Sequence, residues 1–466
     1  MCMRRNDFSK FLLMASCVVL TGQVKAQERM TLDAAVQYAL AHANSIKIAE
    51  SNITDADLQV KERLANGLPQ VNAEVGYQFF AITPKTLIPD FISPAVYGVL
   101  VKEGVKDRTG NPIGFPAGSG GFFEGSFLQR NSLTAGVTAS QLVYSGSYNV
   151  AVKAAKTYRK FVEAQVAVKK TEVRNQVMDV YLPALLVTEG MKTLDNNISN
   201  IEKLLKESSA IQKAGFSEQL DVDRLELSLA NLKVERENLD RQKELILNGL
   251  KMVIQYPLDK PLEVADDVNT LLQANVNLEE QVDFNNHAMY KFLEMTYAMN
   301  ELNVEVNKAA YLPTVSAFAN LQENITANNY FTAGSTKFLP SSVIGIKATY
   351  NIWDNREKKY KIERAQLVLE QLKLQKNDLE RAIQLQNLNA RIQIQTAQKR
   401  VASQQKNIAL AERIYKTTQT KYKEGLGSSL EVVVSEQQLY QSQQNLRQAQ
   451  YDLLVAQKAL QKALGK

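Results

Sequence analysis

The chain has 466 residues, a formal charge of +6, and only 21 glycines and 11 prolines. It is long enough for several domains, and its abundance of Gln, Lys, Leu and Ala favours helices over a loop-rich β fold. The charge is too mild to indicate a nucleic-acid partner.

The first 26 residues have the pattern of a signal peptide. Arg4 and Lys10 precede or border the apolar run 11–20, and the tripeptide VKA ends in the small residue typical of a cleavage site, which predicts an exported protein cut after Ala26. Its removal lowers the formal charge to about +3. Lipidation of Cys17 is an alternative, but it would cut through the apolar run.

Both cysteines, Cys2 and Cys17, lie in that segment, so the mature chain is predicted to contain no thiol. No later stretch approaches the ~18 continuous apolar residues of a membrane-spanning helix. Any contact of the mature protein with the interior of a membrane is therefore expected to be made by strands.

Long helices are predicted over much of the chain. The predicted ranges are 32–65, 147–214, 219–252, 278–310, 356–424 and 430–464. Pro183 and Gly190 are expected to kink the second of these or to divide it into two stacked helices. The 69 residues from Arg356 to Glu424 contain neither Gly nor Pro, and as one helix they would extend roughly 100 Å. Apolar residues recur every seven residues in this stretch, which indicates helices supercoiled on their neighbours. The repeated positions are Ala365, Leu372 and Leu379, and Ile394, Val401, Ile408 and Tyr415.

Strand-like segments occur at matching places in two halves of the chain. LPQVNAEVGY (68–77) is echoed by LPTVSAFANL (312–321), and TASQLVYSG (138–146) by KATYNIWDN (347–355). We interpret the chain as an internal duplication. The predicted divisions are a signal peptide (1–26), a first repeat (27–252) with an outer loop at 81–131, a connector (253–277), and a second repeat (278–466) with an outer loop at 323–341.

The strands alternate apolar and polar residues over a length that spans a bilayer. Lipid-facing positions are predicted at Val71, Val75, Tyr77, Ile344 and Ile346, and interfacial aromatic residues at Phe79, Tyr144 and Trp353. An ordinary half-buried sheet would show the same alternation. The export signal and the long loop rich in Gly, Pro and aromatic residues favour the membrane.

Four strands cannot close a barrel, and open edges are not tolerated in lipid. Copies of the chain must therefore share one barrel. Two copies would give eight strands, whose interior side chains fill, whereas three give twelve strands and leave an aqueous bore.

Six short motifs occur in order over nearly the whole mature chain: MTLDAAVQYALAHA, LVYSG, GFSEQLDV, AAYLPTVSA, NIWDN and GLGSSLEVV. Together they resemble the TolC-type outer-membrane efflux protein family. The resemblance implies a mainly helical fold with a small β part, in which a homotrimer builds a twelve-stranded barrel and a coiled-coil periplasmic tunnel. The long first loop and Asn355, where glycine is common, depart from the family pattern.

The resemblance also implies partners and a location. The protein would lie in the outer membrane, contact its lipid and extend into the periplasm. It would serve as the exit duct for a periplasmic adaptor (membrane-fusion protein) and an inner-membrane transporter of the RND type. Export of drugs, metal ions or polypeptides fits this architecture, so a type I polypeptide-secretion duct is the alternative. A passive porin or a coiled-coil surface protein explains only part of the pattern.

Two glycine turns are predicted to join antiparallel helices. They comprise Gly215, Phe216 and Ser217, and Gly425, Leu426 and Gly427. Glycine ends a helix, and Ser217, Ser428 or Ser429 would begin the next, with Asp221 and Glu431 favoured in its first turn. The resemblance adds adaptor docking at these turns and a periplasmic aperture narrowed by Glu431 and Asp221.

No catalytic or metal site and no cofactor is predicted. The chain contains only two histidines, His42 and His287, and neither lies near a second candidate ligand in the sequence. We find no nucleophile motif and no phosphate-binding loop, so an enzymatic function is not expected.

Overall fold

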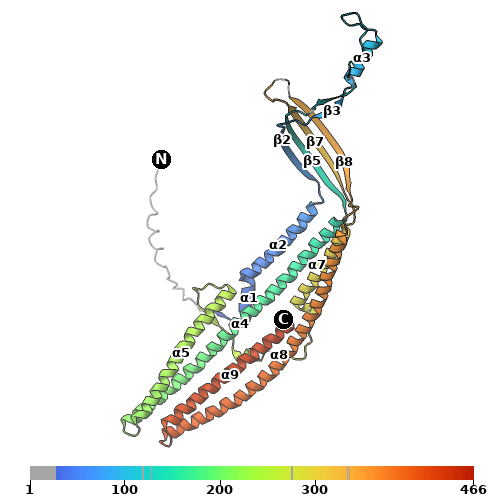
Figure 1. The fold of residues 1–466 in the computed structure, drawn as a ribbon. Coiled ribbons are helices and arrows are strands. Elements are labelled where there is room, and N and C mark those ends of the chain that lie inside the picture. Colours follow the sequence, from blue (N-terminus) through green and yellow to red (C-terminus); the bar gives the residue numbers. More distant parts are fainter. Residues whose placement is uncertain (1–27, 118–119, 127, 274–276, 333, 335) are drawn as a thin grey trace, which may run out of the picture. The chain divides into compact units, whose positions relative to one another are not determined.

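The computed structural model describes residues 28–117, 120–126, 128–273, 277–332, 334 and 336–466. The predicted signal peptide, with Cys2 and Cys17, lies outside these residues. The chain forms two compact units, each made of separate stretches of sequence (Figure 1). The helical unit comprises the chain up to Asp57, Thr157–Asn300 and Leu367–Lys466, and the sheet unit comprises Leu58–Lys156 and Glu301–Gln366.

Helices predominate, which confirms the predicted mainly α fold with a small β part. The longer helices are α1 (Leu32–His42), α2 (Asn44–Ala65), α4 (Gly146–Lys213), α5 (Gln219–Ile254), α7 (Ala288–Ala309), α8 (Glu357–Lys423) and α9 (Ser429–Ala463). Shorter elements of the helical unit are β1 (Glu28–Met30), β6 (Leu262–Val264), α6 (Val268–Leu272) and the 3-10 helix η1 (Phe284–Asn286).

The single helix predicted over 32–65 is in fact two, α1 and α2, separated at Ala43. The Oγ1 of Thr31 caps α1 by accepting a hydrogen bond from the N–H of Ala34 at 3.3 Å. At Ala43 the backbone ψ of 123° interrupts the helical path. Ala43 is buried in the same cluster as Ala39 and Ile46, so the break lets both helices bury apolar residues in one core.

Helix α4 continues through Pro183 and Gly190, so of the two predicted outcomes, a kink or a division into two helices, the division is wrong. Proline inside a helix costs about 3 kcal/mol. Its neighbours Tyr181, Leu182 and Leu185 are buried in the main core. Each fully buried apolar side chain contributes roughly 1.5–3 kcal/mol, so this packing offsets the cost of the proline.

Helix α7 begins at Ala288, ten residues after the predicted start at Leu278. The preceding residues include η1, where Asp283 Oδ1 accepts from the N–H of Asn285 at 3.0 Å. Such a local side-chain hydrogen bond competes with helix formation. The spacing of apolar residues in the sequence does not reveal this competition.

A buried tyrosine ties the N-terminal strand to the core of the helical unit. Strand β1 pairs in parallel with β6. The hydroxyl of Tyr181 lies 2.7 Å from Asp266 Oδ2 and 2.9 Å from the carbonyl oxygen of Met30. The N–H of Leu32 donates to the same Asp266 oxygen at 2.7 Å. Burial and the Asp266 carboxylate raise the pKa of Tyr181, so the hydroxyl remains a donor.

The predicted heptad positions of α8 face the interior. Five of the seven, Ala365, Leu372, Ile394, Val401 and Tyr415, are buried, whereas Leu379 and Ile408 are half-buried, so the packed seam is confirmed at most of its positions. One core cluster of the helical unit joins four helices through Leu204 of α4, Leu225 of α5, Tyr422 of α8 and Val432 of α9.

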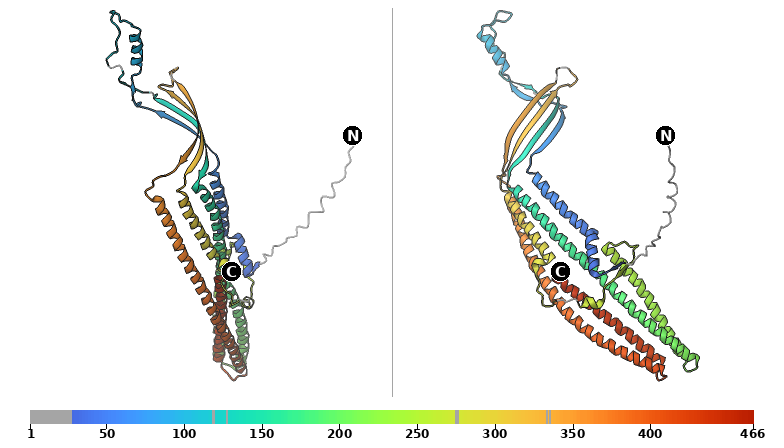
Figure 2. Two further views of the ribbon diagram at one scale, coloured as in Figure 1. Left: turned by 90° about the vertical axis from the view of Figure 1, so that its right-hand side faces the viewer. Right: turned by 180° about the vertical axis from the view of Figure 1, so that it is seen from behind.

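The sheet unit contains one antiparallel sheet of four strands, in the order β2-β5-β7-β8. Its strands are β2 (Gln70–Phe79), β5 (Asn131–Ser145), β7 (Thr314–Ala327) and β8 (Lys337–Thr349). They lie side by side in both views of Figure 2. Strands β7 and β8 extend into the loop predicted at 323–341, so only residues 328–336 connect them.

The loop predicted over 81–131 contains regular structure. Strands β3 (Thr86–Pro89) and β4 (Phe122–Gly125) pair antiparallel, and the helix α3 (Ile92–Lys102) lies between them in sequence. Asp90 Oδ1 accepts from the N–H of Ser93 at 2.9 Å as α3 begins. The apolar residues of this segment therefore form a helix, which its Gly and Pro content did not indicate.

Candidate functional site

The strand register gives the four-stranded sheet two distinct faces. Side chains of directly paired residues share a face, and the faces alternate along each strand. One face is mostly apolar. It carries Val71, Ala73, Val75, Tyr77 and Phe79 of β2; Leu133, Ala135, Val137 and Ala139 of β5; Val315, Ala317, Ala319, Leu321 and Ile325 of β7; and Phe338, Pro340, Ile344, Ile346 and Ala348 of β8. Its uncharged polar members are Asn131 and Gln141 of β5 and Ser342 of β8. Glu323 is a charged residue on this face, between Ala135 and Pro340.

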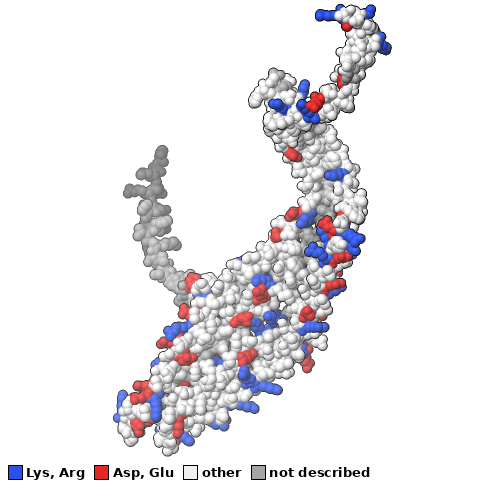
Figure 3. Space-filling model, viewed as in Figure 1, with Lys and Arg blue, Asp and Glu red and all other residues white. Residues whose placement is uncertain are grey.

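The apolar face is exposed to solvent in the single chain. Val75 is 73% exposed and Ile344 is 87% exposed, and Val71, Tyr77 and Ile346 are also exposed. An ordinary sheet would cover such a face with its own core. Figure 3 shows mostly uncharged residues over these strands, whereas acidic and basic residues are scattered over the helices.

The opposite face carries hydroxyl and amide side chains that bond across the strands. Thr134 Oγ1 donates to Asn324 Oδ1 at 2.9 Å, and Asn320 Nδ2 donates to Thr138 Oγ1 at 2.7 Å. Phe318 is an apolar exception on this face. Its ring lies against Gly345, where a Cβ would be 2.9 Å from Phe318 Cζ. The glycine thus provides the space for this ring.

The predicted interfacial aromatic residues lie at or beyond the ends of strands. Phe79 is the last residue of β2, and Tyr144 follows a register shift near the end of β5. Trp353 lies after the end of β8 at Thr349 and is 81% exposed. Asn355 and the following Arg356 both have positive φ, 50° and 66°. Asparagine tolerates this conformation better than most residues, which accounts for Asn355 at a junction where glycine is common.

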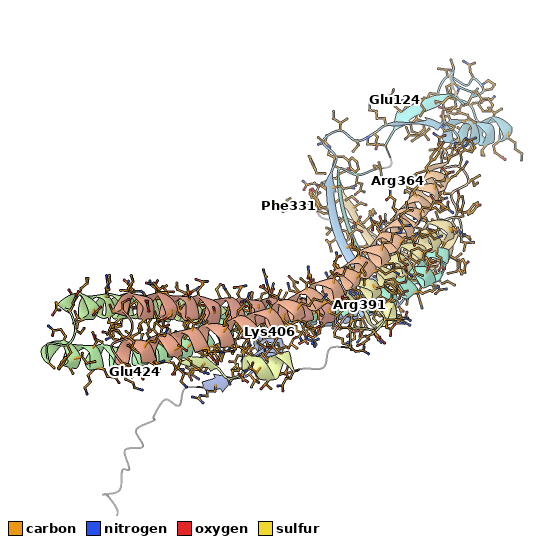
Figure 4. The ribbon with its side chains drawn as sticks, turned by 90° about the horizontal axis from the view of Figure 1, so that it is seen from below. Glu124, Phe331, Arg364, Arg391, Lys406 and Glu424 are labelled. Atoms are coloured by element: carbon orange, nitrogen blue, oxygen red, sulfur yellow. The ribbon has the colours of Figure 1, made fainter. Side chains whose placement is uncertain are left out.

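The two predicted glycine turns have matching backbone geometry. In the first, the N–H of Phe216 donates to the carbonyl of Ile211 at 3.1 Å; in the second, the N–H of Leu426 donates to Lys421 at 2.8 Å. Gly215 and Gly425 adopt φ of 83° and 73°. Each turn is therefore a Schellman motif, in which the glycine ends the helix. Glu424 lies at the end of α8 beside its turn (Figure 4).

The helix starts after the turns differ from each other. Ser428 caps α9, and its Oγ accepts from the N–H of Glu431 at 3.3 Å. Glu218 occupies the cap position of α5, so the predicted cap at Ser217 is wrong. Ser217 instead donates to Asp221 Oδ2 at 3.1 Å.

A hydrogen bond connects the two turn regions. Ser429 at the start of α9 is fully buried, and its hydroxyl donates to Asp221 Oδ1 of α5. Asp221 is therefore occupied by Ser217 and Ser429. Glu431 is exposed, and its carboxylate lies back over Gly427. The two acidic residues predicted as equivalent thus have different surroundings.

A carboxyl group is buried among the helices near these turns. Glu436 of α9 is 3% exposed, and neither its Oε1 nor the hydroxyl of Tyr415 has a hydrogen-bond partner among the described residues. Burial raises the pKa of Glu436 to about 7. Burial and the Glu436 charge raise the pKa of Tyr415 to about 12. The sequence contains a signal for this burial, because Glu436 lies one helical turn from Val432 and from Leu439, and both of these apolar residues are buried.

The sequence did not reveal the Ser429–Asp221 contact, since the two residues are far apart in the chain.

Among the described residues, no group of His, Cys, Asp and Glu could hold a metal ion. Searched over those same residues, the helices include none that is long and apolar enough to cross a membrane.

Comparison with known proteins identifies this architecture. Residues 298–466 match the family model described as outer membrane efflux protein. This match confirms the predicted resemblance to the TolC-type outer-membrane efflux protein family. No curated protein matches the chain.

Solved structures match the fold of this chain over most of its length. VceC from Vibrio cholerae has 15% identity and a TM-score of 0.64, covering 93% of this chain and 96% of VceC. CusC has 14% identity and a TM-score of 0.68, covering 94% and 93%. The Campylobacter jejuni outer-membrane channel CmeC has 16% identity and a TM-score of 0.63, covering 93% and 85%. The family match and these structures together support a location in the outer membrane with a helical part in the periplasm.

The buried Glu436 makes the stability of the protein depend on pH. In the unfolded chain a glutamate has a pKa of about 4.3, and in the folded chain that pKa is raised, so folding favours the neutral form. The stabilisation is complete below about pH 4.3 and is lost as the pH rises towards 7, by about 3 kcal/mol. We expect Glu436→Gln to remove this loss. The measurement is the heat-unfolding midpoint at pH 5 and pH 8, with the exposed Glu412→Gln as control. A pH dependence that is equal in wild type and Glu436→Gln would contradict this account.

Proposed function

We propose that the protein is the outer-membrane exit duct of a tripartite efflux system. Three copies would share one twelve-stranded barrel, and their helices would build a periplasmic tunnel. A periplasmic adaptor would open the tunnel, and an inner-membrane transporter of the RND type would supply the energy. The chain itself would be a passive conduit with no catalytic role and no cofactor.

The main support for this proposal is the four-stranded sheet with an exposed apolar face. Strands of ten to fifteen residues are long enough to cross the hydrocarbon layer. Within the described chain, β2 and β8 each have only one neighbouring strand. Unpaired backbone groups are costly in lipid, so the outer edges of β2 and β8 require further strands. Copies of the same chain provide them with matching geometry.

The polar face supports a water-filled interior. Eight strands would leave a barrel filled by side chains, whereas twelve leave space for passage. Amide and hydroxyl groups such as those of Asn320, Thr138 and Asn324 would then line the bore. The apolar face would contact outer-membrane lipid through Val71, Val75, Tyr77, Ile344 and Ile346, with Phe79, Tyr144 and Trp353 at the interfaces.

We further propose that residues 27–252 and 278–466 are structural repeats joined by a connector at 253–277. The order helix, two strands, long helix, helix in both halves supports this division. The equivalent Schellman turns at Gly215 and Gly425 support it as well. These turns, with Phe216, Ser217, Leu426 and Gly427, would form the adaptor-docking tips.

Glu431 and Asp221 are proposed to act at the periplasmic aperture in different ways. The exposed Glu431 would contribute one carboxylate per copy to a ring around the threefold axis. Asp221 would act through its bond to Ser429 by holding the two turn regions of one chain together in the closed state. An adaptor that separates the tips would break this bond.

A charge on the apolar face should interfere with assembly in lipid. We expect Val75→Lys to cost about 2–4 kcal/mol and to lower the amount of assembled oligomer, because the ammonium group would face hydrocarbon. Gln78→Lys, on the polar face of the same strand, is the matched control and should assemble normally. The measurement is the yield of folded oligomer in outer membranes. Equal losses for the two variants would show that the faces are assigned wrongly.

The aperture role of Glu431 predicts a change in ion selectivity. Three carboxylates about 7 Å apart repel one another by roughly 0.6 kcal/mol per pair in water and attract cations. Glu431→Ala should therefore weaken cation selectivity and block by divalent ions in planar bilayers, and oligomer yield should remain unchanged. Glu424→Ala, on the other side of the turn, is the control. Wild-type selectivity and block in Glu431→Ala would leave Glu431 with only a helix-start role.

A further inference from the structure

Charged residues on the polar face of the sheet occur only on its two edge strands. Glu74 lies on β2, and Lys337 and Lys347 lie on β8. The polar-face positions of the central strands β5 and β7 carry no charge in the sequence. The two edges therefore carry charges of opposite sign.

These charges have no partner within the described part of the chain. The ion pairs among the described residues of the sheet unit do not include Glu74, Lys337 or Lys347. They are formed by other side chains, such as Lys85 with Glu124 and Lys153 with Glu305. Through the register, Glu74 is level with Gly136, Gln322 and Ser341. Strands β2 and β8 are three strand spacings apart, about 14 Å, which keeps Glu74 from Lys347 of its own chain.

The backbone shows on which side of β2 the open edge lies. The N–H of Phe80 donates to the carbonyl of Arg130 at 2.8 Å, so even-numbered residues of β2 direct their backbone groups at β5. Odd-numbered residues, whose side chains form the apolar face, direct theirs at the open edge. In an upward strand of L-residues, a residue facing the viewer directs its N–H and C=O groups to the right. Seen from the apolar face with β2 running upward, β5 therefore lies to the left of β2, and the next copy lies to the left of β8.

The twist of the sheet then gives the register between copies. Barrel strands follow the right-handed twist of sheets, with a tilt of about 35–45°. A line drawn at right angles to the strands therefore climbs the barrel as it runs to the left. It meets β2 of the next copy at a higher residue number than it met β2 of the first copy. With strands about 4.8 Å apart and a rise of about 3.3 Å per residue, the rise over four strands is about 4–6 residues. It must be even, because an odd shift would exchange the two faces.

Lys347 pairs with Ser316, which is level with Leu142 of β5 and hence with Leu68, just before β2. A rise of about four or six residues places Lys347 opposite Asn72 or Glu74 of the next copy. Even in the first case Glu74 is a diagonal neighbour, within reach of a lysine side chain. Lys337, level with Gln78, would lie beyond the end of β2.

We propose that Lys347 of one copy forms an ion pair with Glu74 of the next copy, on the bore side of each seam of the shared barrel. The partner surface is thus a second copy of this chain, and the pair selects the register in which β8 and β2 join. This inference rests on the proposed shared barrel.

Charge exchange tests the pair. We expect Glu74→Lys and Lys347→Glu each to lower the temperature at which the oligomer dissociates in dodecyl sulfate, and the double variant to restore it. Glu74→Lys combined with Lys337→Glu is the matched control and should not restore it. Equal restoration by both combinations, or by neither, would contradict the assigned pair.

Cysteine pairs test the register independently, because the mature chain is predicted to contain no cysteine. Glu74→Cys with Lys347→Cys should yield a covalent three-chain product with a thiol cross-linker of about 8 Å, the diagonal spacing. Glu74→Cys with Lys337→Cys should not. A wild-type oligomer that remains intact while only the Lys337 pair cross-links would overturn the proposed seam and leave the shared barrel standing. Absence of any oligomer in the wild-type protein would instead overturn the proposed function.

Discussion

Backbone pairing at the edges of the four-stranded sheet is the constraint on which the proposed assembly depends. A sheet in water can leave its edge groups bonded to solvent, but a sheet in hydrocarbon cannot. In the proposed assembly the side chains of Val75 and Ile344, which are exposed in the single chain, would face hydrocarbon. The open edges of β2 and β8 then require strands from other copies, and the number of copies follows from the bore that a channel needs. The charged residues at the two edges are compatible with such pairing of β8 with β2 of the next copy, since they have opposite signs.

The helical unit meets different demands. Its heptad seams bury apolar residues, as the core cluster of Leu204, Leu225 and Val432 shows, and this packing stabilises the unit. Polar groups occur within that packing near the turns, where Ser429 bonds to Asp221 and Glu436 is buried without a partner for Oε1 among the described residues. Such groups weaken the interior locally. In the proposed channel an adaptor would open this region, and segments that open locally are less stable than the rest of a protein.

The sequence predicted those features that depend on local periodicity. Alternation in 71–79 predicted β2 and its faces, and heptads predicted the buried seam of α8, because side-chain direction follows the backbone period. The ordered motifs predicted the resemblance to the TolC-type outer-membrane efflux protein family. Predictions failed where contacts between distant residues outweighed local preference, as at Pro183, whose buried neighbours hold α4 continuous. They also failed where a local hydrogen bond competed with the helix, as at Asp283.

The candidate site was only partly accessible from the sequence. The glycine turns could be placed because positive φ favours glycine, and Gly215 and Gly425 have that conformation. The bond from Ser429 to Asp221 could not be placed, since it joins residues whose proximity depends on how the helices pack. The ring of Phe318 against Gly345 is a similar case, because the need for a glycine arises only when the strands are in register.

The mass of the purified protein in detergent tests the central claim most directly. Light scattering or native mass spectrometry, corrected for bound detergent, separates one, two and three copies of a chain of this size. A stable species of three copies is the predicted result. A stable monomer or dimer that conducts ions in planar bilayers would contradict the shared twelve-stranded barrel.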